Sequence, residues 1–74
     1  MTDPIRLSII GSTGSIGEST LKVVDRYPDR LRVVGLATGH NLTRLIEQRQ
    51  RYHPGVLAIT HADANLPPGI SRGA

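Results

Sequence analysis

The chain has 74 residues, too few for more than one domain, and contains no cysteine, which excludes disulfide bridges and thiolate metal sites. Nine basic and six acidic side chains give a net charge of +3, and two tyrosines are the only aromatic residues. Because the basic residues are dispersed and stacking aromatics are scarce, we expect no nucleic-acid partner. The sequence lacks a signal-peptide pattern and any apolar run near the roughly 20 residues that span a bilayer, so we expect no membrane association and a cytoplasmic location.

The first predicted element is a strand at residues 5–10, a short apolar run rich in isoleucine. Such a run is typical of a strand buried on both faces of a parallel sheet. Gly11, Gly14 and Gly17 follow directly. Glycines at this position allow a sharp turn, a close approach of the backbone to a pyrophosphate, and tight packing of the next helix. The turn therefore predicts a phosphate-binding loop, although its Gly-x-x-Gly-x-x-Gly spacing is a variant of the commoner Gly-x-Gly-x-x-Gly pattern.

Three hydroxyl side chains lie within this turn, those of Ser12, Thr13 and Ser15. They can cap the following helix, contact a phosphate, or do both. The helix is predicted from apolar residues that share one face, with Ile16, Thr20, Leu21 and Val24 at helical spacing. Pro28 cannot continue a helix interior, so the helix should end near Arg26.

The second strand is predicted at residues 31–37, followed by Thr38-Gly39-His40-Asn41. Asn41 is a suitable N-cap for a second helix. The apolar face of that helix is predicted to contain Leu42, Leu45 and Ile46, and its outer face Arg44, Glu47, Gln48 and Arg51. His53-Pro54-Gly55 should end the helix, and residues 56–60 form a third apolar run of strand length.

The order strand, helix, strand, helix, strand indicates an α/β fold with a Rossmann-like parallel sheet, the β-α-β-α-β half of a doubly wound fold. We assign residues 1–60 to the N-terminal part of such a nucleotide-binding domain. Residues 61–74 are expected to be an irregular tail or a truncated connection, since Pro67-Pro68-Gly69 blocks regular structure. The first strand is central in a complete fold of this kind, so its free edge predicts a fragment of a longer protein.

The region after the second strand indicates which dinucleotide the fold would bind. An acidic residue about 20 positions beyond the glycines selects a free ribose 2′-hydroxyl, yet residues 37–41 contain no carboxylate. The sequence therefore favours NADPH, with the 2′-phosphate near His40. A protonated histidine attracts a phosphate, so we expect the affinity for NADPH to fall as the pH rises from about 6 to 8. The alternative is that His40 is only a solvent-exposed loop residue.

The other two histidines, His53 and His61, flank the third predicted strand. Neither has a partner at metal-ligand spacing, and no nucleophile, acid pair or histidine cluster has a catalytic arrangement. We therefore predict no metal ligand and no catalytic residue within this chain.

A longer stretch is more specific than the glycine pattern alone. The string from Gly11 to Val24, followed by Pro28-Asp29-Arg30, Val33-Val34-Gly35-Leu36-Ala37, Gly39-His40-Asn41 and Leu45, resembles the 1-deoxy-D-xylulose 5-phosphate reductoisomerase family. The likeness extends from about residue 5 to residue 60. It implies the NADPH-binding N-terminal part of an enzyme that converts 1-deoxy-D-xylulose 5-phosphate to 2-C-methyl-D-erythritol 4-phosphate in the isoprenoid (MEP) pathway of bacteria and plastids.

The resemblance also implies site residues. It places the nucleotide contacts on Thr13, Gly14, Ser15 and Ile16 in the first turn, and on Gly39, His40 and Asn41 after the second strand. His40 stands where the family often has arginine or lysine. A divalent metal, Mn or Mg, a sugar-phosphate substrate and a homodimer are implied for the full-length enzyme, with the metal ligands beyond Ala74, so the fragment alone should be inactive.

Two other interpretations remain open at this point. The chain could belong to another NAD(P)-dependent oxidoreductase with the same glycine turn, such as a semialdehyde dehydrogenase or a sugar epimerase. It could also be complete, as a stand-alone nucleotide-binding module. Its light core and free strand edge would make such a module marginally stable.

Overall fold

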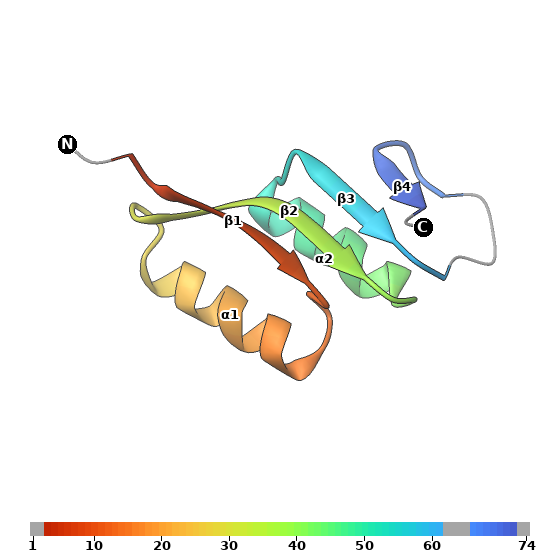
Figure 1. The fold of residues 1–74 in the computed structure, drawn as a ribbon, viewed down its shortest axis with the longest axis horizontal. Coiled ribbons are helices and arrows are strands. Elements are labelled where there is room, and N and C mark those ends of the chain that lie inside the picture. The colour runs from red at the N-terminus through yellow and green to blue at the C-terminus, as the bar shows by residue number, and fades with distance from the viewer. Residues whose placement is uncertain (1–2, 62–65, 73–74) are drawn as a thin grey trace.

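The computed structural model describes residues 3–61 and 66–72. Within them, the strands of a parallel sheet alternate along the chain with two helices (Figure 1). The elements are β1 (Ile5–Ile10), α1 (Ser15–Arg26), β2 (Leu31–Thr38), α2 (Leu42–Tyr52), β3 (Val56–Ile59) and β4 (Ile70–Arg72). The strands lie in the order β1-β2-β3-β4 and every neighbouring pair is parallel. The predicted α/β, Rossmann-like architecture is confirmed.

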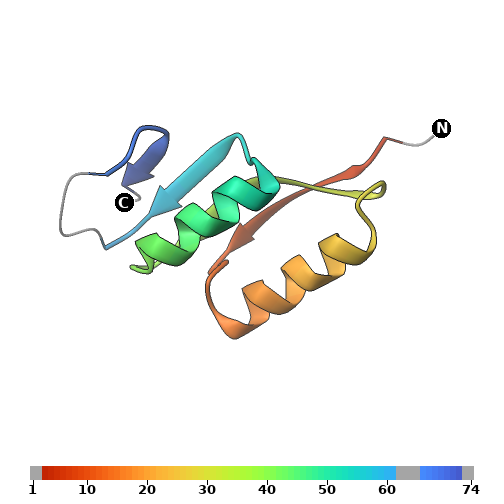
Figure 2. The ribbon, with the colours of Figure 1, turned by 180° about the vertical axis from the view of Figure 1, so that it is seen from behind.

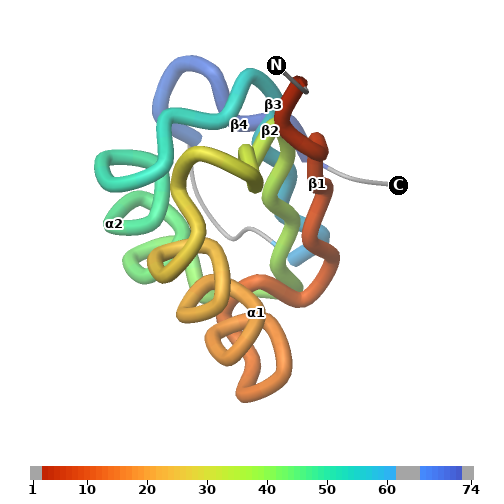
Figure 3. Tube along the Cα trace, turned by 90° about the vertical axis from the view of Figure 1, so that its left-hand side faces the viewer, coloured from red at the N-terminus to blue at the C-terminus, as the bar shows by residue number. Residues whose placement is uncertain are grey.

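Both helices cover the same face of the sheet, as the view from behind and the view along the strands make clear (Figures 2 and 3). The core lies between this face and the helices, and Leu45 is its most deeply buried member, with none of its surface exposed. The other buried apolar residues are Ile9, Leu21, Val24, Val33, Leu36, Leu57, Ile59 and Ile70. All are aliphatic, as the composition required.

The opposite face of the sheet is not covered by any described residue. Ile10 and Val56 are 89% and 65% exposed there, and a shallow apolar surface runs between them past Ala37 and Ala58. Beyond β1 the sheet has no further strand within residues 3–61 and 66–72, as the sequence predicted.

The ends of the helices are where the sequence placed them. α1 ends at Arg26, just before the Tyr27-Pro28 pair, and α2 ends at Tyr52. His53 adopts a left-handed conformation, with φ of 49°, and its N–H donates to the Arg49 carbonyl at 2.9 Å. This geometry closes the last turn of α2 in the usual way for a helix C-terminus.

The predicted faces of the two helices need correction. In α1 the buried residues are Gly17, Leu21 and Val24, whereas Ile16 is 82% exposed. The buried face is rotated relative to the predicted one because Gly17, which has no side chain, lies against the preceding turn. In α2 the predicted outer-face residue Gln48 is buried, because α1 packs beside α2 and covers that side.

Residues 61–74 were expected to be irregular, and this is wrong for β4, which pairs with β3 from Ile70 opposite Leu57. Gly69, with φ of +89°, turns the chain into the strand, and Arg49 Nη1 donates to the Pro68 carbonyl at 3.0 Å. Pairing with β3 buries Ile70, an apolar residue that an irregular tail would leave in water. Positions 62–65, 73 and 74 of that segment lie outside the described residues.

Candidate functional site

The glycine turn is fixed by backbone hydrogen bonds to the end of the neighbouring strand. β1 ends at Ile10, and Gly11 turns the chain with φ of +78°, a conformation that glycine adopts at little cost. The N–H groups of Gly11 and Ser12 both donate to the Ala37 carbonyl of β2, at 2.8 and 2.9 Å. The turn is therefore anchored at the carboxyl edge of the sheet, where α/β folds bind their ligands.

Gly17 sets how closely α1 approaches this turn. A Cβ atom at position 17 would lie 2.3 Å from the Gly11 carbonyl oxygen and 2.7 Å from the Ser12 Cα. No side chain fits such a space without moving the backbone. The helix can begin directly against the turn because this residue is glycine.

The start of α1 is exposed to solvent at Gly14 and Ser15. Gly14 is the N-cap residue and no side chain caps the helix, so the capping role considered for Ser12, Thr13 and Ser15 is wrong. Ser12 is fully buried, and the Thr13 hydroxyl is hydrogen-bonded to the Thr38 hydroxyl. The first N–H groups of a helix have no carbonyl partner within it, and together with the helix dipole they attract an anion.

The second predicted half of the site follows β2. Gly39, His40 and Asn41 connect Thr38 to α2, and His40 is exposed. The Asn41 side-chain oxygen accepts from the Arg44 N–H at 3.1 Å, which confirms the predicted N-cap. A Cβ atom at Gly39 would meet nothing within 4 Å, so this glycine borders open space.

The fold brings the two predicted halves together. The Thr13–Thr38 hydroxyl contact joins the turn to the last residue of β2, and the next residue is Gly39. The His61 N–H donates to the Gly39 carbonyl at 2.6 Å and so ties the end of β3 to the same connection. The predicted site residues, Thr13, Gly14, Ser15, Ile16, Gly39, His40 and Asn41, all lie at the carboxyl ends of β1 and β2. His53 lies at the opposite end of α2.

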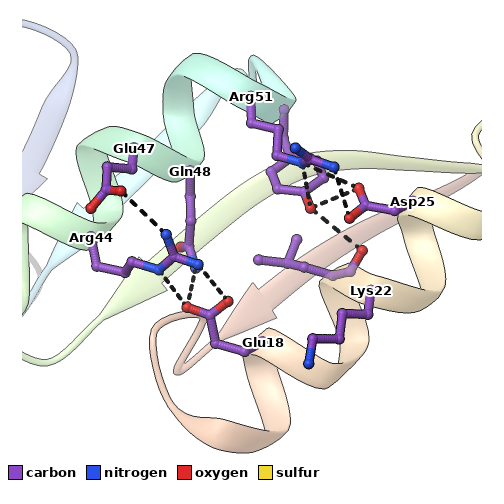
Figure 4. A pocket seen from close by; sticks show the side chains of 9 residues that line it. Glu18, Lys22, Asp25, Arg44, Glu47, Gln48 and Arg51 are labelled. Atoms are coloured by element: carbon purple, nitrogen blue, oxygen red, sulfur yellow. Dashed lines mark hydrogen bonds and ion pairs between the residues drawn. The ribbon is translucent and has the colours of Figure 1, made fainter.

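A polar groove of about 220 Å³ separates α1 from α2 and contains none of the predicted site residues (Figure 4). Arg44 of α2 holds Glu18 of α1 in a bidentate ion pair, with Nε–Oε1 and Nη2–Oε2 distances of 2.6 and 2.9 Å. Farther along, Arg51 Nη2 lies 3.0 Å from Asp25 Oδ2. Because both carboxylates that α1 contributes are paired with arginines of α2, the groove is better explained as a helix contact than as a ligand site.

These contacts change the acidity of the groups involved. Hydrogen bonding to Arg44, against an opposing effect of desolvation, holds the pKa of Glu18 below its ordinary value. Desolvation would raise the pKa of Asp25, but hydrogen bonds from Tyr52 and Arg51 outweigh it and the pKa is lowered. Desolvation, followed by the hydrogen bond to Asp25, raises the pKa of Tyr52. Both carboxylates therefore stay ionised to lower pH in the folded chain than in the unfolded chain.

One contact to the turn was missed by reasoning from the sequence. Gln48 of α2 is 3% exposed, and its Nε2 donates to the Ser12 carbonyl at 2.7 Å. The available signal was its position, since it follows Leu45 by three residues and Asn41 by seven and therefore shares their side of the helix. A glutamine is normally assigned to the exposed face, and this one was.

Comparison with known proteins shows the family of the chain. The family model described as 1-deoxy-D-xylulose 5-phosphate reductoisomerase matches residues 7–67. The chain belongs to this family. Reductoisomerases of Synechococcus sp. (strain CC9902) and Anaeromyxobacter sp. (strain K) are 48% and 49% identical to it over 66 and 70 residues, and these alignments cover 89% and 86% of the chain. That of Thermosynechococcus vestitus is 57% identical over 53 residues, 72% of the chain.

The chain spans only a small part of these reductoisomerases, 15%, 18% and 13% of their respective lengths. Within residues 3–61 and 66–72, no three histidine, aspartate or glutamate side chains come together in a way that could hold a metal ion. No helix in the described part is both long and apolar enough to cross a bilayer.

Proposed function

We propose that this chain is the NADPH-binding N-terminal part of a reductoisomerase. The cofactor's pyrophosphate would be held by the turn residues Thr13, Gly14, Ser15 and Ile16. Its 2′-phosphoribose would be held by Gly39, His40 and Asn41. The observation that supports the proposal best is the hydroxyl contact between Thr13 and Thr38. This contact keeps the N-terminus of α1, which attracts anions, close to residues 39–41, which contain no carboxylate.

The residues present fit a dinucleotide phosphate. Gly14 and Ser15 are exposed at the start of α1, and Gly39 leaves open space where a side chain would stand. Ile16, 82% exposed beside the turn, offers an apolar surface that a bound cofactor would cover. When bound, NADPH supplies a hydride; this part of the chain binds and orients the cofactor.

The activity of the whole protein is a further part of the proposal. By family membership, the full-length enzyme would convert 1-deoxy-D-xylulose 5-phosphate to 2-C-methyl-D-erythritol 4-phosphate with a divalent metal, Mn or Mg, in the bacterial cytoplasm and as a homodimer. Residues 1–60 would be the first part of its NADPH-binding domain. The metal ligands and the substrate site would come from the rest of the enzyme.

The cofactor preference tests this proposal. Titration of the chain with NADPH and NADH should give a Kd about tenfold lower for NADPH, because a charge-assisted hydrogen bond to the 2′-phosphate adds roughly 1.5 kcal/mol or more. Equal affinities for the two cofactors would contradict the assignment of residues 39–41 to the 2′-phosphate. Isothermal titration calorimetry measures both constants directly.

His40 is tested by its pH dependence. NADPH binding should weaken from about pH 6 to pH 8 as the histidine loses its proton. His40→Asn retains a neutral hydrogen-bond donor that does not change its charge with pH. The pH dependence of its NADPH affinity therefore gives the baseline due to the ionisation of the phosphate itself, near pH 6. The matched control is His53→Asn, at the far end of α2, which should behave like the unaltered chain. Identical pH profiles for all three proteins would remove His40 from the site.

A further inference from the structure

Gln48 is a polar residue in a place where an apolar one would be expected. Its side chain lies between α2 and the turn, 3% exposed, and its Nε2 donates to the carbonyl of Ser12, itself fully buried. Burying an amide is costly unless it is hydrogen-bonded. The Gln48 Oε1 and Ser12 Oγ atoms have no partner among the described residues, so the arrangement is not optimised for stability alone.

The same side of α2 contacts α1 one turn earlier. Arg44 binds Glu18, and Gln48 Nε2 also lies 3.4 Å from Glu18 Oε1 (Figure 4). Asn41, at the start of this stripe, caps the helix and belongs to the second predicted half of the site. Residues 41, 44 and 48 therefore connect the end of β2 to the turn after β1 through one rigid helix.

We propose that Gln48 is a positioning residue for the glycine turn. By holding the Ser12 carbonyl it fixes the backbone that precedes the helix start, and thereby the direction of the N–H groups offered to the cofactor's phosphates. This inference rests on the proposed NADPH site for its consequence in binding, but the effect of Gln48 on the turn itself does not require a ligand.

The first test is Gln48→Met, which retains the length and volume of the side chain and removes the hydrogen bond. We expect the Kd for NADPH to rise about tenfold, the loss of one buried hydrogen bond. Binding of adenosine 2′-monophosphate, which has no pyrophosphate, should be unchanged because it does not use the turn. The matched control is Gln50→Met on the exposed side of the same helix, which should bind both ligands like the unaltered chain.

Comparing the two ligands distinguishes a role of Gln48 in positioning the glycine turn from a general role in stabilising the fold. A purely structural role would weaken NADPH and adenosine 2′-monophosphate equally, and that result, or an unchanged Kd for NADPH, overturns the proposal. In the ligand-free chain, amide hydrogen exchange at residues 14–17 should accelerate in Gln48→Met and not in Gln50→Met. If the unaltered chain binds neither ligand, the proposed function fails. If amide hydrogen exchange at residues 14–17 is unchanged in Gln48→Met, the positioning role of Gln48 is overturned, whether or not the chain binds NADPH.

A second variant keeps the test decisive if the methionine variant does not fold. In Gln48→Glu the introduced carboxyl, when ionised, repels the Ser12 carbonyl and Glu18; when protonated, it can donate an O–H to that carbonyl. NADPH binding, expressed relative to Gln50→Glu at each pH, should be weak at pH 7 and recover toward pH 5. A constant ratio between the two variants over this range would overturn the proposal.

Discussion

At the scale of single residues, Gly17 determines whether the turn and α1 can lie together. Gly17→Ala should lower the free energy of unfolding by about 1–3 kcal/mol, because the added methyl group would overlap the Gly11 oxygen and the Ser12 backbone. It should also weaken NADPH binding, since the helix start must move. Urea denaturation measures the first effect and calorimetric titration the second.

The matched control for this substitution is Gly39→Ala. A methyl group at Gly39 meets nothing within 4 Å, and Gly39 is not among the glycines with positive φ, so the change in unfolding free energy should stay within about 0.5 kcal/mol. Equal destabilisation by both alanines would mean that Gly17 is not the close contact described here.

Residues whose role is set by the local backbone could be predicted from the sequence. The glycines at the turn and the Asn41 cap follow from conformational preferences that act within a few residues. Gln48 could not be predicted in this way, because its partner Ser12 lies 36 positions away and the contact exists only after α2 has packed beside the turn. Helical spacing places position 48 on the side of Leu45, but a glutamine is ordinarily assigned to the exposed face.

At the scale of elements, the ion pair between α1 and α2 makes their packing sensitive to pH. Because Arg44 holds the pKa of Glu18 below its ordinary value, the folded state binds its proton less readily than the unfolded state. The pair therefore stabilises the fold at neutral pH, and this stabilisation is lost as the pH falls through the lowered pKa. Glu18→Gln should lower the unfolding midpoint at pH 7, and the difference from the unaltered chain should shrink as the pH falls below about 4.3, the ordinary pKa of glutamate, so that it is smaller at pH 3 than at pH 7.

Glu47→Gln is the control for that measurement. Glu47 makes one longer contact to Arg44, at 3.3 Å, and its side chain is 57% exposed against 28% for Glu18. Its replacement should change the midpoint less at pH 7, since exposed ion pairs contribute little. Thermal unfolding of the three proteins at both pH values decides the matter, and a Glu18 effect that persists undiminished at pH 3 would contradict an electrostatic origin.

Element boundaries were predictable where a single residue enforces them. Pro28 after α1, Asn41 before α2 and the His53-Pro54 pair after it act through local sterics and capping. β4 was not predictable, because three residues carry no periodicity and the strand forms only by pairing with β3. Its formation depends on a tertiary partner, which overrides the turn signal of the preceding prolines.

At the scale of the whole molecule, the parallel topology follows from the alternation of strands and helices, which the sequence displays clearly. Consecutive neighbouring strands with right-handed crossovers place both helices on one face. The other face, with Ile10 and Val56, and the free edge of β1 are therefore consequences of the order of elements. The family model matches residues 7–67, and the chain spans only 15% of the length of the Synechococcus reductoisomerase.

The chain alone should bind NADPH without oxidising it. Hydride transfer requires the substrate to be held in contact with the nicotinamide. More than four fifths of the length of the matched reductoisomerases has no counterpart in this chain. Incubation of the chain with NADPH, Mn²⁺ and 1-deoxy-D-xylulose 5-phosphate should leave the NADPH absorbance constant over hours. In the positive control, a full-length reductoisomerase should consume the cofactor under the same conditions. A substrate-dependent loss of absorbance that disappears in Gly17→Ala would place catalytic groups within this chain. It would contradict the proposal that the chain only binds the cofactor.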